Sequence, residues 1–249
     1  MEWFENEDFW REFYSFMFPP ERISAAKEEV SRILALTQCS AGSVLDLCCG
    51  PGRHSVEFAQ RGFQVTGVDR SPFLLERARE HASKAGASVE WIMEDMRNFV
   101  RPSMFDLACC LFTSFGYFQD EQDNLNVLCN VHQSLKPAGA LVIEVLGKER
   151  LMRTWQNAIC VQLADGSLVV QRPQLRDDCC RVHADWTLIR DGHARSFSFE
   201  HTIYSGRELK DRLLSCGFER VQLFGDLQGS PYDLEATRLV AVARKSTPA

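Results

Sequence analysis

The sequence predicts an α/β protein with a doubly wound, mostly parallel β-sheet and an antiparallel β insertion. Between Val44 and about Leu146, short strand-like runs alternate with stretches of helical periodicity, which is typical of βαβ units. From residue 159 to 204 the pattern changes, because apolar and polar residues alternate and turn signals recur at "ADGS" and "RDGHA". The α/β pattern then returns, so the insertion interrupts a single domain that spans residues 1–249.

The first two βα units follow from local signals. A strand at 43–47 leads into a glycine-rich turn at 48–52 and a helix at 54–62. "FQVTGVD" supplies the second strand. Ser71 then caps a helix that ends at Gly86, because a hydroxyl is favoured at the start of a helix and glycine at its end.

Five more strands complete a sheet of seven. "SVEWIM", "FDLACCLF" and "ALVIEVL" are strand-like runs, and an apolar stripe at helical spacing over residues 125–135 precedes the last of them. "SGRE" is a capping box that opens the helix "ELKDRLLSCG". The strands "ERVQLFG" and "TRLVAVARK" follow this helix.

Composition narrows the class of protein. The chain has 34 acidic and 28 basic residues, a net charge of −6, and no block of lysine or arginine, which disfavours nucleic acid as a partner. The acidic N-terminus lacks the pattern of a secretory signal, and the longest uncharged stretch, residues 107–119, is too short to cross a bilayer. We therefore expect a cytoplasmic protein without a membrane segment.

The cysteines are expected to be reduced. Three adjacent pairs, Cys48-Cys49, Cys109-Cys110 and Cys179-Cys180, fall in strand-like segments, and the chain has no C-x-x-C. Neighbouring thiols on a strand point to opposite faces, so the Cys179-Cys180 pair with His183 is a poor metal clamp. We expect no metal site.

The N-terminus is unusually aromatic. Eight of the first 18 residues are Trp, Phe or Tyr, and so much apolar surface must cover something. Two interpretations stay open, a helix packed on the edge of the sheet and a flap over a ligand. Residues 1–40 are expected to form this helical segment.

The turn after the first strand suggests a nucleotide-like ligand. In a doubly wound sheet the ligand lies beyond the carboxyl ends of the strands, where Gly50 and Gly52 allow close approach of the backbone. Asp69, 19 residues after Gly50, has the position of a carboxylate that accepts ribose hydroxyls. A dinucleotide fold requires a third glycine where this chain has Ser55, which disfavours an NAD-type oxidoreductase.

The motifs in order resemble the class I S-adenosylmethionine-dependent methyltransferases over nearly the whole chain. "DLCCGPG" is similar to the family's D-x-G-x-G-x-G turn, "VTGVDRS" to its ribose-binding strand and "MEDM" to its adenine-binding strand end. "FDLACCLFTSFGYF" resembles the fourth strand, and "SLKPAGALVIEV" the L-x-P-G-G run into the fifth. Two residues depart from the family pattern, since Cys48 and Ala138 stand where it has glycine. The resemblance implies a Rossmann-like seven-stranded fold.

The resemblance also implies S-adenosylmethionine as cofactor and a role for each matched residue. Asp69 would bind the ribose, Asp95 would accept the adenine amino group with Met96 against the ring, and Asp46 would hold the turn or receive the methionine ammonium. An aromatic wall would favour the sulfonium, and Tyr14 is the first candidate for it. The expected cofactor-binding residues are Tyr14, Asp46, Cys48, Gly50, Gly52, Arg53, His54, Asp69, Arg70, Asp95, Met96, Leu111 and Phe112.

The acceptor site is less defined by the sequence. Methyl transfer requires an acceptor lone pair held near the methyl group, so positioning supplies much of the catalysis. Tyr117, His201 and Tyr204 are the candidate catalytic residues, with packing within the protein as the alternative for each. The insertion at 159–204 is expected to act as a substrate lid.

The prediction is a methyltransferase acting at nitrogen or oxygen of a small-molecule acceptor. A non-catalytic protein that binds S-adenosylmethionine stays open as the main alternative, and an NAD-type oxidoreductase is the weaker one. The identity of the acceptor, the atom methylated and the oligomeric state also stay open.

Overall fold

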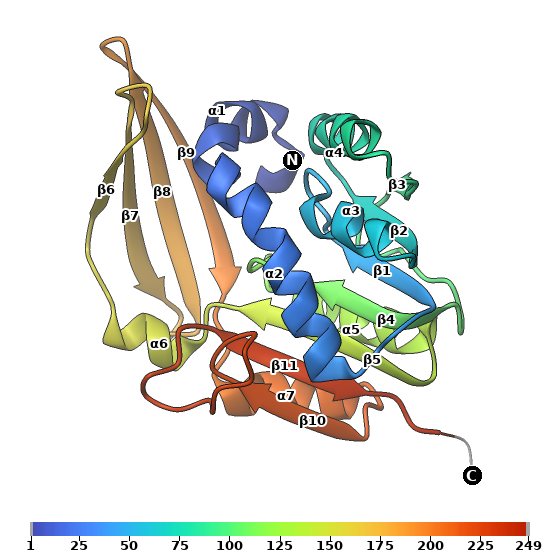
Figure 1. The fold of residues 1–249 in the computed structure, drawn as a ribbon. Coiled ribbons are helices and arrows are strands. Elements are labelled where there is room, and N and C mark those ends of the chain that lie inside the picture. Colours follow the sequence, from blue (N-terminus) through green and yellow to red (C-terminus); the bar gives the residue numbers. More distant parts are fainter. Residues whose placement is uncertain (1, 248–249) are drawn as a thin grey trace.

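A computed structural model describes residues 2–247 of the chain. A seven-stranded sheet forms its centre (Figure 1). In chain order the strands of this sheet are β1 (Ser43–Leu47), β2 (Gln64–Asp69), β3 (Glu90–Met93), β4 (Phe105–Cys110), β5 (Leu135–Val145), β10 (Arg220–Phe224) and β11 (Leu239–Arg244). Their order across the sheet is β10-β11-β5-β4-β1-β2-β3. The predicted fold class is confirmed.

The sheet reverses its winding between β1 and β4. From β1 the chain moves outward through β2 to β3, and then starts again at β4 and moves the other way to β5, with all five strands parallel. β11 runs antiparallel to β5, and β10 antiparallel to β11. The carboxyl ends of β1 and β4 are therefore the place where a ligand is expected in this type of sheet.

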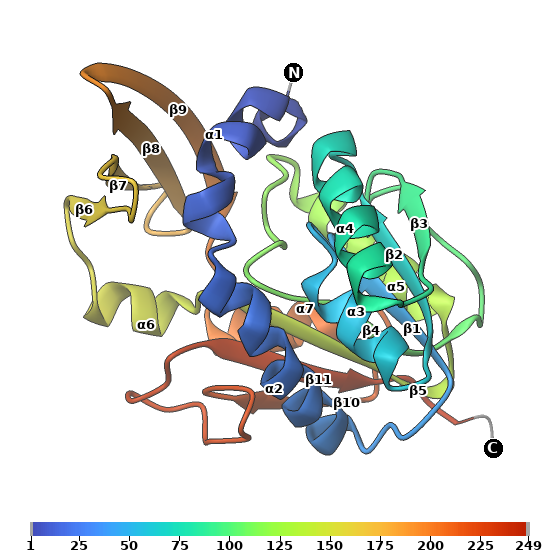
Figure 2. The same cartoon turned by 45° about the horizontal axis from the view of Figure 1, so that its top comes forward.

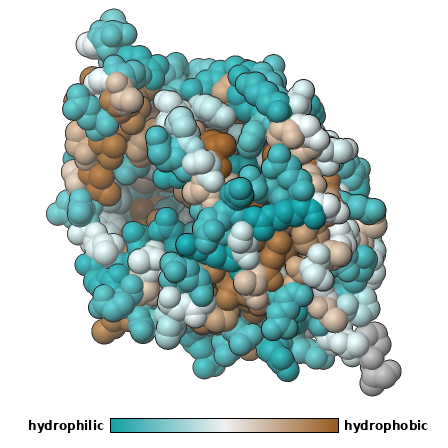
Figure 3. All heavy atoms as spheres, in the orientation of Figure 1, coloured by the Kyte–Doolittle hydropathy of each residue, from teal (hydrophilic) through white to brown (hydrophobic). Residues whose placement is uncertain are grey.

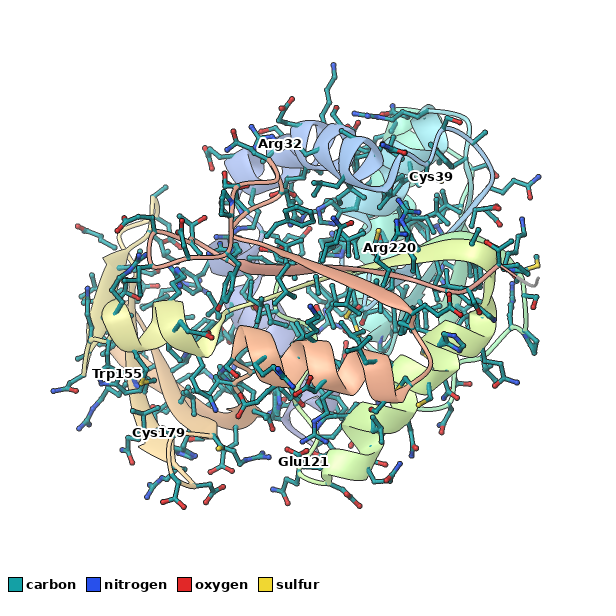
Figure 4. The ribbon with its side chains drawn as sticks, turned by 90° about the horizontal axis from the view of Figure 1, so that it is seen from below. Arg32, Cys39, Glu121, Trp155, Cys179 and Arg220 are labelled. Carbon is teal, nitrogen blue, oxygen red and sulfur yellow. The ribbon has the colours of Figure 1, made fainter. Side chains whose placement is uncertain are left out.

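Helices cover both faces of the sheet. On one face lie α2 (Pro20–Thr37), α3 (Arg53–Gln60) and α4 (Pro72–Ala85). On the other lie α5 (Glu121–Ser134) and α7 (Gly206–Ser215), which Figure 4 shows from below. Ser71 caps α4 by accepting a hydrogen bond from the N–H of Leu74, and Ser205 and Glu208 form the capping box of α7, as the sequence predicts. Within residues 2–247, no helix is long and apolar enough to cross a membrane.

The insertion is a separate four-stranded antiparallel sheet. It consists of β6 (Ile159–Gln162), β7 (Leu168–Arg176), β8 (Arg181–Arg190) and β9 (His193–Thr202), and a short helix that the sequence did not predict, α6 (Lys148–Arg153), precedes it. The expectation that Cys179-Cys180 falls in a strand is wrong. Both thiols are exposed in the turn between β7 and β8, where the backbone of Cys179 is left-handed.

The N-terminal helix joins the insertion to the main body. A 3-10 turn, η1 (Trp3–Glu5), leads into α1 (Glu7–Met17), and Figures 1 and 2 both show α1 between the insertion and α4. Phe9 and Phe13 of α1 are 2% and 0% exposed and pack with Val169, Val182 and Phe199 of the insertion in one apolar cluster. This cluster is distinct from the two that lie on the faces of the central sheet.

Ala138 is a strained position near the start of β5. Its φ is 62°, a left-handed conformation that costs an L-residue about 1–2 kcal/mol and glycine almost nothing. We expect Ala138→Gly to raise the free energy of unfolding by up to about 1 kcal/mol, measured by urea denaturation. Ala87→Gly, at a position outside the left-handed region, is the control and should not stabilise the protein. A loss of stability in Ala138→Gly would contradict this assignment of strain.

Candidate active site

A cavity lies at the carboxyl ends of β1, β2, β3 and β4. It contains about 1010 Å³ of empty space, its open mouth included, which is the size of a small-molecule site. One wall comes from the strand ends and their turns. The facing wall comes from the N-terminal segment, by which we mean residues 3–18, and the remaining side from residues 111–118. Figure 3 shows hydrophobic atoms over the insertion at the left, beside a hollow that separates it from the body.

The glycine-rich turn forms the floor of the cavity. Gly50 has a φ of 56°, and a Cβ there would lie 3.5 Å from the Phe18 ring. Cys48, in the place of a family glycine, also has a positive φ of 58°, and its Sγ lies 3.5 Å from the Met96 Sδ. Gly52 lies outside the cavity wall. A Cβ on Gly52 would come within 2.5 Å of the Trp91 ring, so this glycine serves the packing of the turn.

Asp69 connects the end of β2 to this turn. Its Oδ2 accepts the N–H of Gly50 at 2.8 Å, and its Oδ1 accepts the N–H of Ser71 at 2.9 Å. The side chain is 9% exposed and lines the cavity. Burial raises the pKa of Asp69 to about 6, although the two backbone donors oppose the shift. Each carboxylate oxygen keeps a lone pair for a further donor in the cavity.

Asp95 and Met96, just after β3, also line the cavity. Asp95 is 2% exposed, and its oxygens accept hydrogen bonds from the Arg97 side chain at 2.7 and 3.0 Å and from Arg70 at 3.3 Å. Burial raises the pKa of Asp95, but the hydrogen bonds and charge of Arg97 outweigh it, so the pKa is lowered and the group stays ionised. Arg70 in turn pairs with Glu5 of η1, which ties the N-terminal segment to this end of the cavity.

Asp46 and the start of α3 anchor the opposite end. Asp46 is 2% exposed and accepts a hydrogen bond from the Ser55 hydroxyl, so it holds the first turn of α3. Glu29 of α2 pairs with both Arg53 and His54, the latter at 2.7 Å. Despite its burial, the hydrogen bond from His54 and the charge of Arg53 hold the pKa of Glu29 at about 2.

The turn after β4 is strained and faces the cavity. Phe112 and Thr113 have φ values of 59° and 57°, a conformation that is rare in residues with side chains and concentrates at functional sites. The N–H of Phe112 donates to Glu144 Oε2 at 3.2 Å, and that of Thr113 to the Glu144 carbonyl at 3.0 Å. Glu144 thus holds the turn that carries Leu111 and Phe112 against the cavity.

Positive charge is in excess beside Phe112. The Arg22 and Arg53 guanidinium carbons lie 4.5 and 5.6 Å from the centre of its ring. Burial, and then the nearby charges of Arg53 and Arg238, lower the pKa of Arg22. This group contains three arginines, Arg22, Arg53 and Arg238, against two carboxylates, Glu29 and Glu144. Of these residues only Arg53 is predicted from the sequence, because no local motif marks the others.

The N-terminal segment supplies apolar side chains to the cavity. Trp3, Phe4, Trp10, Met17 and Phe18 line it. Tyr14 does not line it. The Tyr14 ring lies 5.5 Å from that of Phe18 and 5.6 Å from that of Phe73, so this tyrosine packs α1 against α4.

The three candidate catalytic residues differ in their access to the cavity. Tyr117 lines it, and its hydroxyl makes no hydrogen bond to the described part of the chain. His201 lies behind Tyr117, with 5.4 Å between ring centres, and neither ring nitrogen of this buried side chain has a partner among residues 2–247. Burial, with the charge of Arg181, lowers the pKa of His201 to about 4. Tyr204 is buried and stacks on Phe115.

No described residue of the insertion lines the cavity. Its contribution is indirect, because it packs against α1 and because the N–H of Thr202 donates to the Gly116 carbonyl at 2.7 Å. The insertion therefore supports two walls of the cavity from behind.

The sequence is similar to those of known methyltransferases. Residues 44–139 match the family model described as a methyltransferase domain. A glycine/sarcosine N-methyltransferase from Parasynechococcus marenigrum (strain WH8102) is 32% identical over 208 residues, which cover 79% of this chain and 70% of that protein.

Solved structures share the fold. An S-adenosylmethionine-dependent methyltransferase from Clostridium acetobutylicum ATCC 824 superposes with a TM-score of 0.81 at 16% identity, over 96% of this chain and 98% of that one. CalS10, an amino pentose methyltransferase from Micromonospora echinaspora in its S-adenosylmethionine-bound structure, superposes with a TM-score of 0.65 at 24% identity, over 90% and 91% of the two chains.

The fold and the cavity define an enzyme of the Rossmann-like methyltransferase class. The chain belongs to the class I S-adenosylmethionine-dependent methyltransferases, and S-adenosylmethionine is its methyl donor.

Proposed function

We propose that this enzyme methylates a nitrogen or oxygen atom of a small-molecule acceptor, held in the cavity beneath the N-terminal segment. One observation carries the proposal. A single cavity joins the strand ends, where this type of sheet binds its ligand, to a facing wall of apolar side chains from residues 3–18. An enclosed cavity with apolar walls and a few polar groups is typical of small-molecule sites.

The residues along the cavity fit the donor from end to end. Asp69 would accept the ribose hydroxyls, and Asp95 with Met96 would receive the adenine. At the other end, Arg53 lines the cavity and pairs with Glu29, and Arg22 lies beside Phe112 without lining the cavity; this excess of positive charge would attract the methionine carboxylate. The neighbouring Asp46 carries the opposite charge for the methionine ammonium.

The chain would act mainly by positioning and by excluding water. S-adenosylmethionine supplies a methyl group on a sulfonium, and this bond breaks as the bond to the acceptor forms, with its electron pair left on sulfur. Tyr117 offers a free hydroxyl to orient the acceptor. The buried, neutral His201 packs behind Tyr117 and Tyr204 behind Phe115, so we assign both to positioning of this wall.

The two segments outside the core would cover the site together. Of the flap expected over residues 1–40, residues 3–18 act as the flap, since their aromatic side chains line the cavity and Glu5 pairs with Arg70 at the adenine end. α2 belongs to the core, because its Val30 and Ile33 pack on the sheet. The insertion at 159–204 acts as the support of that flap. The sequence predicted a substrate lid whose inner face lines the cleft. We propose instead that the insertion holds the flap in place without lining the cavity.

Relatives favour nitrogen as the methylated atom. The relative from Parasynechococcus marenigrum is named for N-methylation of glycine and sarcosine, and CalS10 is named for an amino pentose. Both names describe small acceptors that contain nitrogen.

The pH dependence of donor binding should reveal Asp69. Its raised pKa of about 6 means that the carboxylate gains a proton at higher pH than an ordinary aspartate. We expect the affinity for S-adenosylmethionine to rise as the pH increases from 5 to 7, and Asp69→Asn to flatten this part of the profile in calorimetric titrations. The same shift lowers the stability of the free protein as the pH rises from about 4 through 6, because the folded state binds this proton more tightly than the unfolded state. An unchanged profile in Asp69→Asn would assign the effect to another group.

The proposed function is tested by titration and turnover. We expect calorimetry to show binding of S-adenosylmethionine, and mass spectrometry to show transfer of a labelled methyl group to at least one member of a panel of amines, phenols and amino acids. Tight donor binding without transfer to any small molecule would favour the non-catalytic alternative and overturn the proposal.

A further inference from the structure

The geometry points to a hydrophobic amine without a carboxylate as the acceptor. This inference rests on the proposed function and narrows its substrate class. It depends on three properties of the cavity. These are the apolar character of the wall that faces the donor, the pairing of the cationic side chains with carboxylates, and the hydrogen bonds that hold the carboxylates near the glycine-rich turn.

Among the described residues, the wall that faces the donor carries no charged side chain, and its unpartnered donor is the buried Trp3 Nε1–H. The side chains that the N-terminal segment contributes are Trp3, Phe4, Trp10, Met17 and Phe18. The Trp10 Nε1–H is already used, because it donates to the Phe4 carbonyl at 2.8 Å. An acceptor against this wall buries apolar surface, and aromatic rings such as Trp10 stabilise a nearby ammonium by cation–π attraction.

The cationic side chains of the cavity are already paired. Among the described lining residues, Arg53 and His54 pair with Glu29, and Arg70 pairs with Glu5 and Asp95. The one excess of positive charge, around Arg22 beside Phe112, is assigned to the carboxylate of the donor. An acceptor carboxylate would therefore lose its hydration without gaining an ion pair, which is a large cost.

Among the described lining residues, the carboxylates near the glycine-rich turn are already held by hydrogen bonds, and Glu94 lies beside Asp95 at the adenine end. Asp46 is bonded to Ser55, Asp69 to two backbone N–H groups, and Asp95 to arginines. Burial raises the pKa of Tyr117, so its hydroxyl stays protonated and acts as a hydrogen-bonding group. A phenol bound in its neutral form would have to lose its proton inside the cavity, whereas an amine that releases its proton to solvent and binds as the free base brings its own lone pair.

The reaction balances for an amine. The nitrogen lone pair forms the new N–CH₃ bond, the S–CH₃ bond breaks with its electron pair on sulfur, and the positive charge moves from sulfur to nitrogen. The methylated ammonium then releases a proton to water. Tyr117 can accept an N–H hydrogen bond from the amine, which directs the lone pair away from the hydroxyl.

Matched ligand pairs test this inference in the full-length protein. Phenethylamine is compared with phenylalanine, and tyramine with tyrosine, so that only the carboxylate differs. With the protein saturated with S-adenosylhomocysteine, we expect each amine to bind about tenfold or more tightly than its amino acid, by calorimetry. With S-adenosylmethionine, the amine should be the member of each pair that is methylated at nitrogen.

Two sets of variants link the preference to the wall. Trp10→Ala should weaken phenethylamine binding by about tenfold. Leu234→Ala, a truncation of an exposed apolar side chain that does not line the cavity, should leave it unchanged. Met17→Arg, which adds an unpaired cation to the wall, should narrow the preference for the amine over phenylalanine, while Met17→Gln should not.

The outcomes separate the inference from the proposed function. Tighter binding or faster methylation of phenylalanine, glycine or sarcosine, or transfer to 4-ethylphenol in place of the amines, would overturn the inference and leave a small-molecule methyltransferase. Binding of none of the amines to the loaded protein would also overturn it. Transfer to no small molecule at all would overturn the proposed function.

Discussion

Asp69→Asn should weaken the binding of S-adenosylmethionine by about 30- to 150-fold, which corresponds to about 2–3 kcal/mol for lost charge-assisted hydrogen bonds. The carboxylate is buried and fixed by the N–H groups of Gly50 and Ser71, so it cannot relax away from the ligand. Asparagine keeps the shape of the side chain and loses the charge. Calorimetric titration of the folded variant measures the effect, and far-UV circular dichroism checks that α4 is retained, as its Ser71 cap predicts.

A matched variant controls for general damage to the sheet. Asp106 of β4 also accepts a backbone N–H, that of Ser43 at 2.8 Å, and pairs with Lys136 at 2.7 Å, but it does not line the cavity. Asp106→Asn should keep the affinity for the donor within about twofold of the original. An analogue without the ribose hydroxyls should bind Asp69→Asn and the original protein almost equally. Unchanged affinity in Asp69→Asn would remove Asp69 from the donor site.

The parts of the site that the sequence predicts are those encoded locally. Asp69 ends β2, Gly50 is in the turn after the neighbouring β1, and Asp95 follows β3. Their spacing along the chain is therefore enough to predict that all three lie at the same edge of the sheet. Arg22, Glu29 and Glu144 were missed because their role comes from contacts across the fold. Arg238, for example, reaches Glu144 from 94 residues away.

The sequence also did not predict which residues of α1 face the cavity. Trp10 and Met17 are seven residues apart and share the face that lines the cavity, whereas Tyr14 points to α4. Phe9, Phe13 and Phe16 form a second stripe that meets the insertion. Both stripes are present in the sequence, but the residue pattern does not tell which stripe faces the cavity and which the insertion.

In the strands of the insertion, too, the residue pattern does not tell which partner the buried face meets. The alternating pattern predicts one buried and one free face, and this is what β8 has along its length and β9 has at Phe197, Phe199 and His201. The buried face meets α1, however, and not the cavity. Alternation fixes which residues of a strand share a face, and the partner of that face is fixed by the tertiary structure.

Phe13 should therefore control acceptor turnover although it does not line the cavity. It is 0% exposed, and its ring lies 5.5 Å from Trp186 and 5.7 Å from Phe197 of the insertion. Phe13→Ala should lower the free energy of unfolding by about 3–5 kcal/mol, the usual cost of such a truncation in a core. Because it loosens α1 and the wall that α1 supplies, it should also lower kcat/KM for the acceptor by about tenfold or more.

Phe218→Ala separates the two effects. Phe218 is 2% exposed and packs edge-on to His132 at 5.0 Å, in the cluster on the α5 and α7 face of the sheet. It should lose a similar free energy of unfolding, about 3–5 kcal/mol, and retain acceptor turnover at temperatures where the protein is folded. Urea denaturation and steady-state kinetics on both variants provide the comparison. If both variants lost turnover equally, or neither did, α1 would have no specific role in holding the acceptor, and the insertion would serve stability alone.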